Sequence, residues 1–241
     1  MMLRCLFILS IVFVAINAMG APPADCSESV QCPKGYKLQK RKNGPWCNKF
    51  IPGNLTWWEA ERECRCTTKG ATLSGIETSS EKKWLEEETQ NLLDKEKIQN
   101  GAVWIGAYRR KVCPSGEQDK WSKNALCSDE KMFQFTDRHS CGTFIFQDWA
   151  DKFPTSAAGD NCGVIVVSTE SSGANADISG KAADKNCESV TGPSPILNSV
   201  GFVCGVKPIQ GGNGGYSGGG GGYSGGGEAI IIGAGKPTKK Q

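Results

Sequence analysis

The large number of cysteines limits the folds that are open to this chain. The sequence of 241 residues contains 12 cysteines, and it opens with Met1, Arg4 and the apolar run LFILSIVFVAI, followed by small residues up to Gly20. That order is typical of a secretory signal peptide. A membrane anchor is the alternative, but a spanning helix needs about 20 apolar residues and this run is shorter. We therefore expect residues 1–20 to be a signal peptide and the mature protein to be secreted into an oxidising extracellular compartment, where cysteines pair.

The mature chain keeps an odd number of cysteines. Removal of the signal peptide takes away Cys5 and leaves eleven, so at least one thiol is free, capped or joined to another chain. Cys26 lies in an N-terminal arm, residues 21–31, and is our candidate for a disulfide-linked dimer, which a non-reducing gel showing only monomer would contradict. The sequon NLT at Asn54 predicts N-glycosylation, with an unused chance match as the alternative.

The composition changes abruptly near the C-terminus. Residues 209–241 contain GGNGGYSGGGGGYSGGG, in which GGYSGG occurs twice. Glycine loses the most entropy on ordering and this run has no apolar side chains to bury, so we expect a flexible tail. The formal net charge of +3 is too small to indicate a nucleic-acid partner, and IIIGAG is too short to insert into a membrane. Residues 32–208 then form one domain.

Two helices are predicted by their caps. TWWE places Thr56 at an N-cap and Glu59 three residues later, a capping box that opens WWEAERECRC. TSSE repeats the pattern with Thr78 and Glu81 and opens KKWLEEETQNLL. Both helices lie in the first half of the chain.

The second half contains short runs typical of strands. They are AVWIGAY, MFQFTD, TFIFQDW, CGVIVVS and VGFVCGV, separated by polar segments rich in turn residues. Helices segregated from strands indicate an α+β domain with antiparallel sheets and long loops.

The order of these motifs resembles the C-type lectin-like domain. A cysteine-bounded entry, CPKGYKLQKRKNGPWC, precedes AEREC, GATLSGIETSSE and WIGAYR, and these are followed by FTD, a proline loop, NCGVIVV, DKNC and GFVCG. Single pieces such as WIG are weak, whereas their joint order and cysteine spacing are specific. The similarity covers nearly all of residues 32–207 and implies the long form of the fold, with an N-terminal hairpin. It also implies three disulfides: Cys32 with Cys47, Cys64 with Cys204, and Cys162 with Cys187.

Five other cysteines lie in the mature chain. Cys113 and Cys127 flank the polar insertion after WIGAYR, so a local disulfide is the simplest pairing. We pair Cys66 with Cys141, which leaves Cys26 in the arm, and the other pairings among these three stay open.

The resemblance also implies a place for a ligand. Sugar-binding members hold Ca²⁺ with a Glu-Pro-Asn or Gln-Pro-Asp tripeptide, an acidic residue before the next cysteine and a WND motif, because Ca²⁺ takes about 6–8 oxygen ligands. The tripeptide falls here on Phe153, Pro154 and Thr155, and phenylalanine offers no oxygen. Asp160 and Asp184 keep carboxylates, with Thr155 as a weak third donor. We expect a degenerate Ca²⁺ site at Asp160 and Asp184, for which two solvated aspartates are the alternative interpretation.

Proline is retained in this loop although its flanking ligands are lost. In the family that X-Pro bond is cis and turns both neighbouring side chains to one face, so we expect a preserved scaffold at Pro154 with changed contents. Phe153 then either stacks on a ligand or packs the loop onto the core. The expected ligand-binding residues are Phe153, Pro154, Thr155, Asp160 and Asp184.

The resemblance implies a secreted binding module for a carbohydrate or cell-surface ligand, such as a glycan or glycoprotein. We expect no strong Ca²⁺ dependence and no required cofactor, and a role in innate defence follows only by family analogy. The alternative is a structural matrix or cuticle-associated protein whose Gly-Tyr tail drives assembly. In that case, deletion of residues 211–241 would abolish assembly. An enzyme is not expected, because His139 is the only histidine and nothing recognisable pairs with it.

Overall fold

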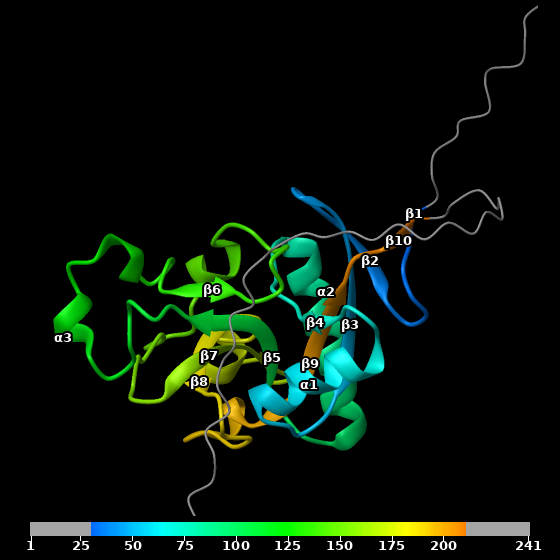
Figure 1. Cartoon of the computed structure of the whole chain (residues 1–241). Coiled ribbons are helices and arrows are strands. Elements are labelled where there is room, and N and C mark those ends of the chain that lie inside the picture. Colours follow the sequence, from blue (N-terminus) through cyan, green and yellow to red (C-terminus); the bar gives the residue numbers. More distant parts are fainter. Residues whose placement is uncertain (1–29, 211–241) are drawn as a thin grey trace, which may run out of the picture. The chain divides into compact units, whose positions relative to one another are not determined.

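The structure, a computed structural model, describes residues 30–210 (Figure 1). These residues belong to the first of the two units into which the chain divides, Met1–Gly211. The predicted signal peptide, Cys26 and nearly all of the predicted tail lie outside the described residues. Within them, no helix is long and apolar enough to cross a membrane.

The two long helices begin where their caps predict. Helix α1 spans Trp57–Thr67, and Thr56 and Glu59 form the complete capping box. Helix α2 spans Ser79–Glu96, and the Thr78 side chain accepts from the amide of Glu81. The second box is incomplete because the Glu81 carboxylate bonds to Arg41 and to the amide of Glu77. The Glu81 side chain therefore forms a buried ion pair with Arg41 and does not complete the capping box.

An eight-stranded sheet forms the centre of the domain. Its main path runs β2-β3-β9-β5-β7-β8, with β4 paired to β9 and β6 paired to β5, and a separate pair joins β1 to β10. The strands are β1 Val30–Gln31, β2 Lys37–Arg41, β3 Gly44–Pro52, β4 Thr72–Leu73, β5 Asn100–Arg109, β6 Phe133–Phe135, β7 Asp160–Ser168, β8 Ala182–Asn186, β9 Ser199–Val206 and β10 Ile209–Gln210.

The α+β class is confirmed, but the sheet is mixed and not purely antiparallel. Strands β5 and β9 run parallel. They are far apart in sequence, so no tight hairpin fixes their relative direction. Strand β8 was not predicted, because its sequence AADKN is too polar to indicate a buried strand.

The predicted strand TFIFQDW is wrong. Its centre forms a short 3₁₀ helix, η2, at Phe144–Gln147. Ile145 and Phe146 are consecutive and both buried, whereas a strand would place neighbouring side chains on opposite faces. The other short helices are α3 Gln118–Trp121, η1 Ala125–Cys127, α4 Ala174–Asp177 and η3 Pro195–Leu197.

The core occupies both faces of the sheet. Trp57 and Ala60 of α1 pack with Trp104 in one cluster, while Leu85 of α2 packs with Ile105 in the other. Trp104 and Ile105 are neighbours in β5, so the alternation of that strand sends one residue to each cluster. Figure 1 shows the loop that carries α3 extending away from β1 and β10.

The part of the chain that the structure describes contains four disulfides, and all four were predicted. They join Cys32 to Cys47, Cys64 to Cys204, Cys113 to Cys127 and Cys162 to Cys187.

The pairing of Cys66 with Cys141 is wrong. Both cysteines are free. Cys66 lies exposed in the last turn of α1, whereas Cys141 follows β6 and its thiol donates to Glu77 Oε1 at 3.2 Å. The two thiols belong to different elements and have different surroundings.

Candidate functional site

The proline loop and β8 bring the predicted site residues together. The Phe153–Pro154 peptide bond is cis, as the resemblance implied. The amides of Thr155 and Ser156 donate to the two carboxylate oxygens of Asp184 at 2.7 and 2.8 Å. The loop is therefore held to β8 through the Asp184 side chain.

Asp184 is neutralised from inside the protein. Its carboxylate Oδ2 accepts from Arg109 Nη2 at 2.9 Å, and the two residues are only 1% and 2% exposed. Burial lowers the pKa of the Arg109 guanidinium, and the charge and hydrogen bond of Asp184 oppose that shift. A buried pair of this kind, with hydrogen bonds to the remaining lone pairs, keeps both charges inside the fold.

Asp160 lies beside this pair and is more open to solvent. Its carboxylate accepts from the Thr155 hydroxyl at 2.8 Å, and its main-chain oxygen accepts from Arg109 Nε at 3.0 Å. Burial raises the pKa of the Asp160 carboxyl, while the hydrogen bond from Thr155 acts in the opposite direction. Phe153, the remaining predicted site residue, packs against the core.

These residues do not fit a Ca²⁺ ion. The cation needs about 6–8 oxygen ligands, but both oxygens of Asp184 are already used and Phe153 offers none. The positive charge that would neutralise Asp184 is supplied by Arg109. Within residues 30–210, no group of three or more histidine, cysteine, aspartate or glutamate side chains could hold a metal ion.

The sequence analysis did not identify Arg109 as a site residue, although the alternation of buried residues along β5 indicates it. Val103, Ile105 and Ala107 alternate along β5 and enter the same core cluster. Arg109 continues that alternation and is likewise buried. An arginine in register with a buried face requires an internal acidic partner.

A hollow is lined in part by Phe133, the ring that contacts the Arg109 guanidinium. Its volume is about 250 Å³. The Arg109 guanidinium lies over the Phe133 ring, 4.7 Å from its centroid. Phe133 stacks on Phe146 at 5.7 Å between ring centroids, and Phe146 on Phe135 at 5.2 Å. Phe133 therefore connects the aromatic rings at the floor of the hollow to the ion pair of Arg109 with Asp184.

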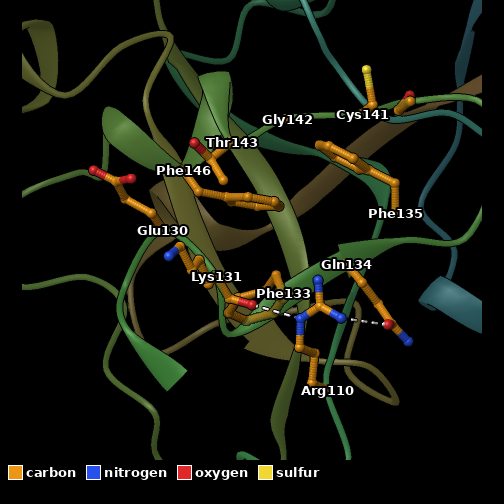
Figure 2. A pocket seen from close by; sticks show the side chains of 11 residues that line it. Arg110, Glu130, Lys131, Phe133, Gln134, Phe135, Cys141, Gly142, Thr143 and Phe146 are labelled. Carbon is orange, nitrogen blue, oxygen red and sulfur yellow. Dashed lines mark hydrogen bonds between the residues drawn. The ribbon is translucent and has the colours of Figure 1, made fainter. Parts of the chain in front are cut away.

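Polar groups surround this aromatic floor. Figure 2 shows the rings of Phe135 and Phe146 between Arg110 on one flank and Cys141 to Thr143 on the other. Arg110 Nε donates to the Lys131 main-chain oxygen at 2.7 Å and Nη1 to Gln134 Oε1 at 3.1 Å. The hydrogen bond from the Cys141 thiol to Glu77 raises the pKa of that thiol.

Lys185, the neighbour of Asp184 in β8, is a buried cation that forms no ion pair within residues 30–210. Its ammonium donates to the Val190 main-chain oxygen at 2.9 Å and to Ser199 Oγ at 2.8 Å, and it lies 4.6 Å from the centroid of a Trp104 ring. Burial lowers the pKa of Lys185 to about 8.

Comparisons with known proteins identify the family of this chain. Residues 37–207 match the model of the family C-type lectin domain-containing protein 141/158. Snaclec stejaggregin-B subunit alpha from Trimeresurus stejnegeri is 30% identical over 128 residues, which cover 52% of this chain and 70% of that protein.

Solved structures are similar at lower identity. CEL-IV aligns with a TM-score of 0.46 and 19% identity over 74% of this chain and 96% of that one. A calcium-independent type II antifreeze protein aligns with a TM-score of 0.45 and 20% identity over 76% and 99%. The Ca²⁺-independent C-type lectin SPL-2 from Saxidomus purpuratus aligns with a TM-score of 0.43 and 19% identity over 73% and 93%.

Arg109→Met should destabilise the domain by about 3–5 kcal/mol, because it leaves the Asp184 carboxylate buried without its cation. The double variant Arg109→Met, Asp184→Asn should lose less than the sum of the two single changes. Urea unfolding of the four proteins measures this coupling. Arg110→Met is the matched control, since that guanidinium is half-exposed and forms no ion pair among the described residues. Equal losses for the two single arginine variants would contradict the assignment.

The buried ammonium of Lys185 predicts a pH dependence. The folded pKa of about 8 lies below the unfolded value of about 10.4, so the unfolded state binds more protons between these values. The free energy of unfolding should therefore rise as the pH increases from about 8 to 10.4. Lys185→Met should remove this rise in chemical denaturation of the thiol-blocked protein. The same slope in both proteins would contradict the prediction.

Proposed function

Because this chain belongs to the C-type lectin domain family of its matched model, we propose that it is a secreted recognition module that binds a carbohydrate or cell-surface ligand without Ca²⁺. Domains of this family are generally binding modules and not enzymes. The proposal assigns recognition to direct contacts with side chains and backbone, in place of contacts through a metal.

The ion pair of Arg109 with Asp184 is the main support for recognition without Ca²⁺. In Ca²⁺-dependent recognition, the ion must be held by carboxylates that face the ligand. Here Asp184 faces inward, and an internal guanidinium and two loop amides saturate it. The loop is therefore shaped before any ligand arrives, and preorganisation of this kind lowers the entropic cost of binding.

Secretion is the second part of the proposal. The four disulfides are the kind of cross-link that persists in oxidising compartments. Asn54 is exposed in the segment between β3 and α1, which suits a glycan. A role in defence rests on family analogy alone and becomes specific only when the ligand is known.

The proposal predicts how binding responds to a chelator. The purified full chain, applied to a glycan array, should bind a set of glycans equally in millimolar Ca²⁺ and in excess EDTA, because no ligand contact passes through a metal. Signals that disappear with EDTA would contradict metal-independent recognition. Absence of binding to any glycan would contradict the carbohydrate part and leave a protein surface ligand to be sought.

A further inference from the structure

The rim of the hollow carries unused positive charge. Arg110 donates through Nε to the Lys131 main-chain oxygen and through Nη1 to Gln134 Oε1. Its Nη2 group has no partner among the described residues. The Lys131 ammonium forms no ion pair with any described residue, and Lys131 lines the hollow together with Glu130, both of them exposed. Two cations against one carboxylate favour an anionic group, while Glu130 remains available as an acceptor for hydroxyl donors.

The floor of the hollow offers one aromatic surface to a ligand. Phe133 and Phe146 are buried, whereas Phe135 is half-buried. An apolar face of a ring-shaped ligand can pack on Phe135 while its polar edge reaches the rim. A wholly apolar ligand fits poorly, because it would desolvate the guanidinium and the ammonium without pairing them.

The walls are fixed before a ligand binds. On one side Arg109 supports Phe133. On the other side the Ser140 hydroxyl, beside Cys141, donates to Asp137 at 2.6 Å and accepts from Arg41 Nη1 at 2.7 Å. Arg41 itself bonds to Glu81 at 2.6 Å, and both side chains are fully buried. These contacts hold the rim and the floor in one arrangement, which favours binding.

We propose that this hollow binds one ring of a saccharide that carries a carboxylate or sulfate group, an inference that rests on the proposed function. The volume of about 250 Å³ lies below the roughly 300–1,000 Å³ of pockets for drug-sized ligands and suits a single ring. The anionic group pairs with Arg110 and Lys131, the ring packs on Phe135, and hydroxyls reach Glu130 and the Thr143 hydroxyl. The hollow is a site separate from the proline loop, because none of the residues that line it lies in residues 151–160.

Binding of three small probes to the full chain tests this proposal. Methyl β-D-glucuronide and glucose 6-sulfate represent the two sources of charge, and methyl β-D-glucoside is the neutral counterpart. NMR or calorimetric titration should show at least about tenfold tighter binding of one or both anionic sugars, because a charge-assisted hydrogen bond contributes about 1.5–3 kcal/mol. Lys131→Gln should weaken that binding, whereas Lys69→Gln, which removes the same charge from the exposed turn after α1, should not.

The two free thiols provide a second readout within one molecule. Cys141 lines the hollow and Cys66 lies exposed on α1. A saturating anionic sugar should slow the alkylation of Cys141, measured by peptide mass spectrometry, and leave that of Cys66 unchanged. Equal affinity for the neutral sugar, no protection of Cys141, or no binding of any probe would overturn the proposal. Glycan-array binding that persists in those cases would leave the proposed function standing, and its absence would also contradict the carbohydrate part of that function.

Discussion

The buried ion pair between Arg109 and Asp184 is the interaction on which the rest of the functional face depends. A charge in a protein interior must be paired and hydrogen-bonded, or the domain loses several kcal/mol of stability. Asp184 meets this requirement with one guanidinium and two loop amides. Three elements, β5, β8 and the loop at Pro154, are thereby joined at one point. Hydrogen bonds within the chain therefore fix the position of the proline loop, which a bound metal ion could otherwise fix.

The same pair also organises the hollow. The Arg109 guanidinium lies over Phe133, and the rings of Phe146 and Phe135 continue the stack. The ion pair of Arg41 with Glu81 acts similarly at the other wall, where it joins β2 to the first turn of α2. In the core, the Cys64–Cys204 disulfide closes a loop of 140 residues, a constraint worth up to roughly 5 kcal/mol. These ion pairs and this disulfide connect elements that are distant in the sequence.

Local rules in the sequence predict much of this fold. Caps locate the starts of α1 and α2 because Thr56 and Thr78 satisfy orphan amides within one turn. The resemblance to the C-type lectin-like domain implies three of the four disulfides, and only Cys113 with Cys127 follows from proximity in the sequence. The 3₁₀ turn at Phe144–Gln147 could not be predicted this way, since apolar runs of that length suit either a strand or a buried helical turn.

The site is less predictable than the fold, because it depends on contacts between distant residues. Asp160 and Asp184 can be located from the resemblance, but whether Asp184 faces a ligand or the interior is decided by Arg109, 75 residues away in sequence. Cys66 and Cys141 could not be assigned for the same reason, because counting cysteines does not reveal which pairs are close in space. The hollow has no local motif, since Arg110, Lys131 and Phe135 come together only when β5 and β6 pair.

A crystal structure of the domain grown in 10 mM CaCl₂ would show whether Arg109 or a calcium ion holds the Asp184 carboxylate. It should show Arg109 Nη2 and the amides of Thr155 and Ser156 on the Asp184 carboxylate, with no metal between Asp184 and Asp160. A peak of density at about 2.3–2.6 Å from oxygens of both aspartates, with Arg109 turned away, would be calcium coordination. That result would contradict the account, because it would mean that the ion pair yields to the metal it is inferred to replace.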